Sequence, residues 1–124
     1  MKVLIVEDSK TLRRLVKRTV EALKFECCEA NNPNEALEIL EKDHMQISLI
    51  LLDWNMPEMS GIDFLDILKK IKKYKDIPVI MITCQSTKDH VLMAVNKGAI
   101  GYIIKPFSQL DLTNKIQLTL IYRP

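Results

Sequence analysis

The feature that most constrains this chain is a regular alternation of short apolar runs with longer segments of helical period. The strand-length runs cover Lys2–Val6, Glu26–Glu29, Ser48–Leu52, Pro78–Ile82 and Gly101–Ile104. Apolar side chains recur with the spacing of an amphipathic helix over Lys10–Lys24, Asn34–Lys42, Gly61–Tyr74, Thr87–Lys97 and Gln109–Ile121. The pattern predicts a strand followed by a helix, repeated five times.

This order of elements predicts an α/β architecture. Strand–helix–strand units with nearly continuous apolar strands form parallel sheets that helices cover on both faces. Right-handed crossovers then favour a doubly wound, flavodoxin-like sheet of five parallel strands in the order 2-1-3-4-5. The 124 residues are too few for a second domain of ordinary size, so we expect one domain spanning residues 1–124.

The composition argues against several classes of protein. A content of 48% hydrophobic and 27% charged residues is typical of a globular protein and not of a disordered one. The net charge of +2 gives no reason to expect nucleic-acid binding, and the first residues resemble neither a signal peptide nor a membrane span. We expect a cytoplasmic monomer that binds neither nucleic acid nor a membrane. Cys27, Cys28 and Cys84 lack metal-ligand spacing, which predicts reduced thiols that are buried or half-buried.

Asp53 ends the apolar run Leu49–Leu52, where a buried strand would not ordinarily carry a charge. Ligands of doubly wound sheets bind beyond the carboxyl ends of the strands. Glu7 and Asp8 follow the first strand, so three acids are expected at one edge. Crowded carboxylates repel one another unless a cation is present. Their hard oxygen atoms, without Cys or His in the cluster, favour Mg²⁺.

Thr83 and Lys105 follow the fourth and fifth strands, at the same predicted edge. A hydroxyl and an ammonium can hydrogen-bond and neutralise phosphate oxygens, and a carboxylate can attack phosphorus. The pattern therefore predicts transfer of a phosphoryl group to Asp53. Taken singly, each of these residues is more often a helix cap, a turn former or a solvated side chain. The prediction depends on all of them sharing one edge.

Four motifs resemble the receiver domain of two-component response regulators: "VEDS", "LLDWNMPEMSG", "MITCQ" and "GYIIKPF". They occur in the order and spacing of that family, and the resemblance covers essentially the whole chain. The "DWNMP" run, Tyr102 and the lack of a following output domain make the chain most similar to single-domain chemotaxis regulators. The resemblance implies a signalling switch that takes its phosphoryl group from a histidine kinase. The resemblance implies that the chain is not an enzyme and catalyses only its own phosphorylation and dephosphorylation.

The resemblance also assigns the residues of the site. Asp53 is the implied phosphoacceptor, and Mg²⁺ is the implied cofactor. Asp8 would bind the metal directly, Glu7 mostly through water, and Asn55 through its backbone carbonyl. The family form also makes the Lys105–Pro106 peptide cis, an isomer that proline allows at low cost.

Thr83 and Lys105 carry over from the family as the pair that senses the phosphoryl group. Thr83 would move toward it, and Tyr102 would swing inward to fill the vacated space. The implied partner is a flagellar motor switch protein, and the candidate contacts are Val91, Tyr102, Ile104 and Lys115.

Several positions vary within or depart from the family pattern. Glu7 stands where Asp is commoner, which lengthens that arm of the metal site. Cys84 follows Thr83 where Ala or Gly is usual, so a bulkier side chain lies beside the site. Asn55 and Gln85 are expected to flank the path of the water that hydrolyses the phosphoryl group.

Three other classes share part of this pattern. A phosphatase of the haloacid dehalogenase type needs a second Asp two residues after its nucleophile, where this chain has Asn55. A flavodoxin-like FMN protein cradles phosphate with a Ser/Thr/Gly-rich loop after its first strand, where this chain has Glu7 and Asp8. A receiver excised from a longer transcriptional regulator stays open, because a chain cut at Pro124 would look the same.

Two basic clusters are predicted to be solvated surfaces that offset the acidic edge. They are Arg13, Arg14, Lys17 and Arg18 in the first helix, and Lys69, Lys70, Lys72, Lys73 and Lys75 around the end of the third. A kinase-docking role for the first helix is compatible with the family.

Overall fold

The computed structural model describes residues 1–121 and contains one sheet with five α-helices around it. The strands are β1 (Lys2–Val6), β2 (Glu26–Ala30), β3 (Ile47–Asp53), β4 (Val79–Thr83) and β5 (Gly101–Ile104). The helices are α1 (Lys10–Ala22), α2 (Pro33–Asp43), α3 (Gly61–Lys70), α4 (Lys88–Asn96) and α5 (Gln109–Ile121), with a short 3₁₀ helix η1 (His44–Gln46). All neighbouring strands are parallel, in the order β2-β1-β3-β4-β5, so the predicted fold class is confirmed.

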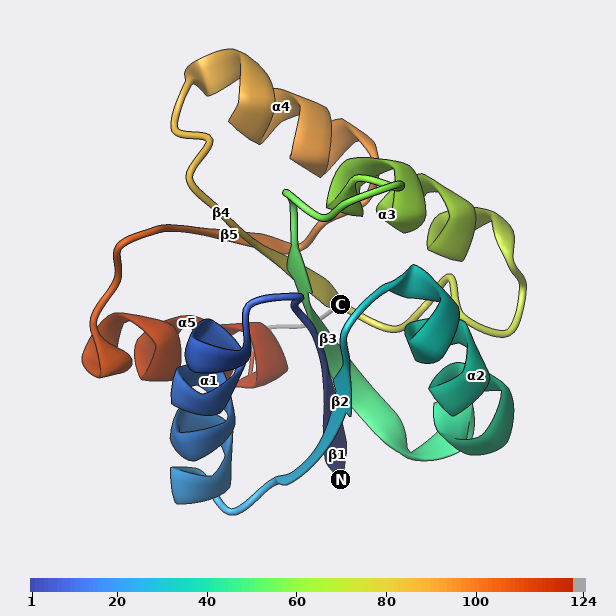
Figure 1. Cartoon of the computed structure of the whole chain (residues 1–124), viewed down its shortest axis with the longest axis horizontal. Helices are drawn as coiled ribbons and strands as arrows, with labels where there is room; N and C mark the ends of the chain where they lie inside the picture. Colours follow the sequence, from blue (N-terminus) through green and yellow to red (C-terminus); the bar gives the residue numbers. More distant parts are fainter. Residues whose placement is uncertain (122–124) are drawn as a thin grey trace.

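The helices cover both faces of the sheet. Helices α1 and α5 pack on one face, while α2, α3 and α4 lie on the other (Figure 1). Successive side chains of a strand point to opposite faces. In β1, Leu4 and Val6 therefore enter one core, and Val3 and Ile5 enter the other. Burial on both faces is the reason that the central strands are almost continuously apolar.

All five α-helices begin after a side chain that caps the helix. Each capping side chain accepts a hydrogen bond from the backbone N–H three residues further on, and these residues are Ser9, Asn32, Ser60, Thr87 and Ser108. Such caps satisfy donors that the first turn of a helix leaves unpaired. Helix α3 begins at Gly61 as predicted, and α2 begins at Pro33, one residue before the predicted start at Asn34. The caps fix where the loops of the carboxyl edge end.

Some predicted boundaries were wrong. Helix α3 ends at Lys70 rather than Tyr74, because the backbone of Ile71 is extended and the following turns bury Tyr74 and Ile77. Asp53 is the last residue of β3 rather than the residue after it. The apolar pattern also missed η1, which follows α2 without a break. Within residues 1–121, no helix is both long and apolar enough to cross a membrane.

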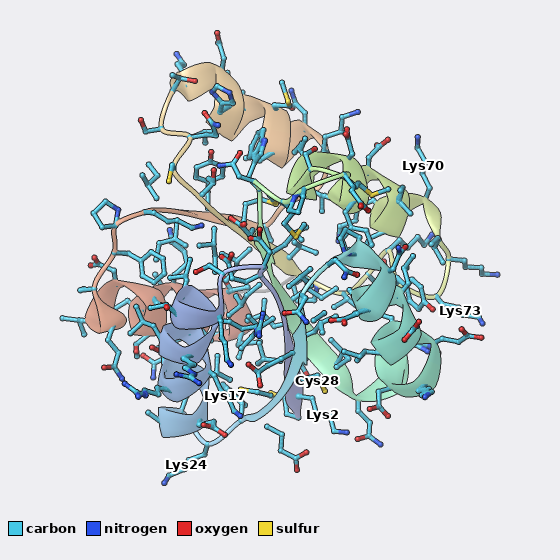
Figure 2. All side chains as sticks on the ribbon, viewed as in Figure 1. Lys2, Lys17, Lys24, Cys28, Lys70 and Lys73 are labelled. Carbon is cyan, nitrogen blue, oxygen red and sulfur yellow. The ribbon has the colours of Figure 1, made fainter. Side chains whose placement is uncertain are left out.

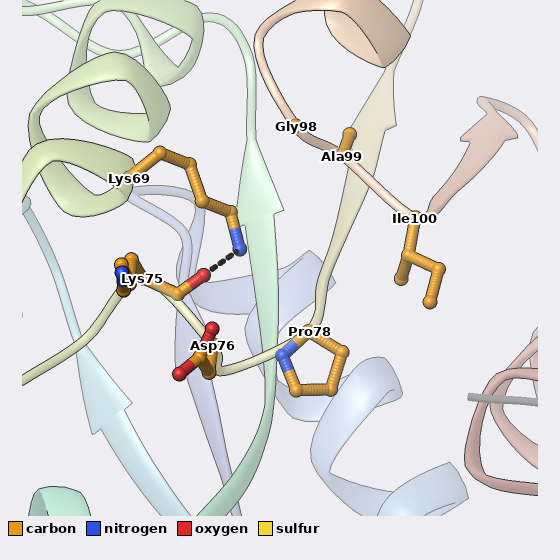
Figure 3. A pocket seen from close by; sticks show the side chains of 7 residues that line it. All are labelled: Lys69, Lys75, Asp76, Pro78, Gly98, Ala99 and Ile100. Carbon is orange, nitrogen blue, oxygen red and sulfur yellow. Dashed lines mark hydrogen bonds between the residues drawn. The ribbon is translucent and has the colours of Figure 1, made fainter. Parts of the chain in front are cut away.

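The two basic clusters are less uniform than predicted. Lys70 and Lys73 extend from the surface (Figure 2), as expected. Lys69 instead folds back beside Gly98, and its Nζ donates to the carbonyl oxygen of Lys75 at 3.0 Å (Figure 3). The same Nζ donates to the carbonyl oxygen of Ile77 at 2.8 Å. Its ammonium therefore clamps the loop that leads into β4. Arg13 is also no solvated residue, since its side chain is only 14% exposed.

Candidate functional site

Three acids meet at the carboxyl edge of the sheet. Glu7 directly follows β1, and Asp53 ends β3 on the neighbouring strand. Glu7 and Asp53 are 3% and 2% exposed, whereas Asp8 is exposed. One carboxylate oxygen from each of the three lies within 4.8 Å of the others. The structure thus brings together the three acids that the sequence placed at this edge.

Glu7 is held in the pocket by hydrogen bonds to both of its carboxylate oxygens. Oε2 accepts from the backbone N–H of Ser9 at 3.0 Å, and Oε1 accepts from Nζ of Lys105 at 3.4 Å. The pKa of Glu7 is raised to about 7, mainly by burial and also by the charge of Asp53. The hydrogen bond from Ser9 and the charge of Lys105 lower this pKa but do not outweigh the burial. A cation in the pocket would offset this penalty and favour the ionised carboxylate.

Lys105 supplies the positive charge of the site. It follows β5, where its backbone N–H donates to the carbonyl oxygen of Thr83 at 2.8 Å, and its peptide bond to Pro106 is cis. Its Nζ lies 2.9 Å from Oδ1 of Asp53. Burial disfavours the ammonium, but the hydrogen bond to Asp53 and the charge of Glu7 outweigh it and raise the pKa of Lys105. Lys105 is therefore a stable cation against the Asp53 carboxylate.

Gly61 is a residue of the site that sequence reasoning treated only as a helix start. Its backbone N–H donates to the carbonyl oxygen of Trp54 at 2.7 Å. A Cβ at this position would lie 1.9 Å from the carbonyl oxygen of Asp53, which no side chain can tolerate. The absence of a side chain therefore lets the first turn of α3 pack against the peptide that carries Asp53.

Thr83 and Tyr102 contact the same residue of the loop between β4 and α4. The register pairs Asp53 with Ile82, so Thr83 lies one residue further along the neighbouring strand. Its Oγ1 accepts from the backbone N–H of Gln85 at 3.0 Å, while the Tyr102 hydroxyl donates to the Gln85 carbonyl oxygen at 2.5 Å. Burial raises the pKa of Tyr102, which keeps this hydroxyl protonated. The two switch candidates are thus joined through one residue.

The remaining predicted residues are more scattered. Tyr102, Ile104 and Lys115 line one groove between β5 and α5, whereas Val91 is half-buried on α4 and does not line it. Asn55 is exposed, two residues beyond Asp53.

The cysteine prediction was wrong at one of its three positions. Cys27 and Cys28 are half-buried free thiols, as predicted. Cys84 is an exposed thiol, because the chain leaves the sheet after Thr83.

The sequence matches the family described as "Response regulator receiver domain" over residues 3–117. This chain is a response regulator receiver domain. It is 39% identical to chemotaxis protein CheY1 of Helicobacter pylori over 121 residues, which cover 97% of each chain.

Solved structures of other receiver domains have the same fold. The chemotaxis protein CheY4 of Vibrio cholerae superposes with a TM-score of 0.86 at 31% identity, covering 94% of this chain and 95% of that one. The Mn²⁺-bound form of response regulator Rcp1 gives a TM-score of 0.77 at 26% identity, covering 98% and 92%. In this receiver domain, the acidic cluster lies at the carboxyl ends of β1 and β3.

Proposed function

We propose that this receiver domain is a phosphorylation-activated switch of a two-component system, with Asp53 as its phosphoacceptor. One observation carries the proposal: Asp53 is a buried carboxylate 2.9 Å from the Lys105 ammonium, beside two further acids. A carboxylate oxygen of Asp53 attacks the phosphorus of a phosphohistidine in the kinase. The P–N bond breaks, its electron pair leaves with the imidazole, and an acyl phosphate forms on Asp53.

Lys105 orients the Asp53 carboxylate and offsets the negative charge that gathers as the phosphoryl group approaches. The pocket also fits Mg²⁺, because its donors are hard oxygen atoms and two of its acids are buried close together. Glu7, Asp8, Asp53 and the backbone carbonyl of Asn55 would hold the ion. When bound, the metal would supply positive charge to the oxygens of the transferring group.

The signal leaves the site through Thr83 and Tyr102. A phosphoryl group adds roughly 1.5 to 2 negative charges and attracts the nearby hydroxyl of Thr83 as a donor. Because Thr83 and Tyr102 both contact Gln85, a shift of the threonine displaces the residue that holds the tyrosine. The Tyr102 hydroxyl donates to the Gln85 carbonyl oxygen, so this displacement would free the ring to move into the space that Thr83 vacates.

The output surface comprises Val91, Tyr102, Ile104 and Lys115, on α4, β5 and α5. Three of these residues surround one groove, and Ile104 is 41% exposed although it is apolar. Similarity to chemotaxis proteins supports a cytoplasmic role in chemotaxis, with a flagellar motor switch protein as the partner. The receiver catalyses its own phosphorylation and dephosphorylation only, and Asn55 and Gln85 flank the hydrolytic water.

The test is incubation with Mg²⁺ and acetyl phosphate, followed by intact-protein mass measurement. We expect one acid-labile phosphoryl group on the natural chain and on Thr83→Ala, and none on Asp53→Asn. Phosphorylation should tighten binding to the switch protein by about 5- to 150-fold, and Thr83→Ala should lose most of this gain. Phosphoryl uptake by Asp53→Asn would overturn the assignment. Equal binding by both forms of the natural chain would overturn the switch and leave the Asp53 chemistry standing.

A further inference from the structure

We propose that Arg13 is a positioning residue that holds the peptide between Glu7 and Asp8, and thereby sets the affinity of the acidic pocket for Mg²⁺. The proposal rests on the proposed function, since it concerns the same pocket. In the contacts described here, Arg13 touches none of the carboxylates proposed to bind the metal, so its effect on the metal would be indirect. The matched residue for comparison is Arg14, its exposed neighbour in α1.

Arg13 makes more hydrogen bonds through its side chain than a solvated arginine would. Nη1 donates to the backbone carbonyl oxygen of Glu7 at 2.8 Å and also to Oδ1 of Asn31. Nε donates to Oε1 of Glu29 at 3.2 Å. The planar fork of a guanidinium can serve several acceptors at once, which a single ammonium cannot do in the same geometry. Arg13 therefore links α1 to the ends of β1 and β2.

The basic cluster of α1 divides into two classes by its contacts. Arg13 and Lys17 are four residues apart and share the face of the helix that meets Glu29. The Lys17 side chain stays 40% exposed, and its Nζ lies 3.4 Å from Oε2 of that carboxylate. Arg14 and Arg18 are exposed. Among the described residues 1–121, Arg13 is the one member of this cluster whose side chain reaches the loop after β1, which carries Glu7 and Asp8.

The carbonyl that Arg13 contacts belongs to the peptide linking Glu7 to Asp8. The N–H of Glu7 is already fixed, because it donates to the carbonyl oxygen of Ala30 at 3.0 Å. The Arg13 contact fixes the carbonyl group of Glu7, and this sets the orientation of the peptide that leads to Asp8. Asp8 itself is exposed, and its place relative to Asp53 depends on this peptide.

Two effects of Arg13 on a bound cation have opposite signs. As a positive charge near the pocket, the guanidinium repels Mg²⁺, so its removal would tighten binding. As a positioning group, it holds Asp8 in place, so its removal would weaken binding. Groups that orient metal ligands typically change metal affinity by about 10- to 100-fold when mutated. We expect positioning to dominate, with a loss of about 10-fold.

The experiment is titration of the full chain with Mg²⁺, followed by Trp54 fluorescence, for the natural protein, Arg13→Ala, Arg13→Lys and Arg14→Ala. Arg13→Ala should bind Mg²⁺ about 10-fold more weakly. Arg13→Lys should also bind more weakly although it keeps the charge, and Arg14→Ala should stay within about twofold of the natural protein, because an exposed charge is well screened. Without metal, the backbone amide NMR signals of Asp8 and Ser9 should shift in Arg13→Ala and not in Arg14→Ala.

Phosphorylation by acetyl phosphate gives a second readout. Arg13→Ala should need about 10-fold more Mg²⁺ for its half-maximal rate and reach the natural rate at saturation, whereas general damage to the fold would lower the maximum. If Arg13→Ala does not fold, Arg13→Lys carries the same test. Unchanged or tighter Mg²⁺ binding by the Arg13 variants, or an equal loss in Arg14→Ala, would overturn the inference alone. A natural protein that neither binds Mg²⁺ nor takes a phosphoryl group would overturn the proposed function as well.

Discussion

Lys105 and Lys69 are partly buried lysines at opposite edges of the same sheet. Lys105 follows β5 at the carboxyl edge and contacts the carboxylates of Asp53 and Glu7. Lys69 lies beside the amino end of β4 and donates to the carbonyl oxygens of Lys75 and Ile77. Burial disfavours the ammonium at both edges. Yet the pKa of Lys105 is raised by its acidic partners, and burial lowers the pKa of Lys69.

The difference shows that the partners of a buried lysine decide what it does. Opposite charges compensate desolvation and leave an ammonium poised against a carboxylate, which is useful for binding a phosphoryl group. Neutral carbonyl oxygens accept hydrogen bonds from the Lys69 ammonium without supplying an opposite charge. Lys69 therefore serves as a clamp that links α3 to the loop before β4. We therefore expect Lys105 to control the chemistry and Lys69 to control stability.

The largest expected effect is on phosphorylation. Lys105→Met should slow phosphoryl uptake from acetyl phosphate by about 100-fold or more, because it removes a charged donor beside the attacking carboxylate. Lys69→Met should stay within about twofold of the natural rate, since Lys69 lies at the far edge of the sheet. The measurement is the initial rate of acid-labile phosphate formation at saturating Mg²⁺. Far-ultraviolet circular dichroism of each variant serves as the control for folding. A comparable loss in both variants would show that the two edges are not independent.

Much of the site could be predicted from the sequence because its residues stand at strand ends. Glu7, Asp53, Thr83 and Lys105 each follow or end an apolar run, and one topological rule places the carboxyl ends of parallel strands at one edge. The strand order itself followed from the alternation of strands and helices. Local pattern and chain topology were sufficient for both.

The remaining features depend on where one side chain points in three dimensions. Nothing in the cluster Arg13, Arg14, Lys17 and Arg18 marks which guanidinium turns toward Glu7, because β2 brings Glu29 and Asn31 from a distant part of the chain. The lysines around the end of α3 are equally alike in sequence. Ile71 and Tyr74 continue the helical spacing, but the chain buries Tyr74 in a turn instead. Tertiary contacts override local preference at these positions.

A smaller effect is expected on stability. Lys69→Met keeps most of the alkyl chain beside Gly98 but leaves two carbonyl oxygens without their ammonium donor. We expect the free energy of unfolding to fall by about 1 kcal/mol. Lys70→Met is the matched control, because Lys70 is exposed and forms a surface ion pair with Asp66. This substitution should change the free energy of unfolding by less than about 0.5 kcal/mol. Urea titration of the metal-free protein measures the change in the free energy of unfolding for both variants. Equal changes in the two variants would contradict the role of Lys69 as a clamp.

The smallest expected effect is the pH dependence of the Lys69 contribution. Burial lowers the pKa of folded Lys69 below its ordinary value of 10.5, with the charge of Asp76 opposing. Between the folded pKa and 10.5, the unfolded chain binds more protons at this site than the folded protein, so the free energy of unfolding rises with pH in that window. The difference in unfolding free energy between the natural protein and Lys69→Met should therefore increase as the pH approaches 10.5. The difference between Lys69→Arg and Lys69→Met should stay flat, because arginine remains charged. A natural-protein difference that decreases instead would mean that the two carbonyls hold the ammonium more strongly than burial penalises it, and Lys69 would then resemble Lys105.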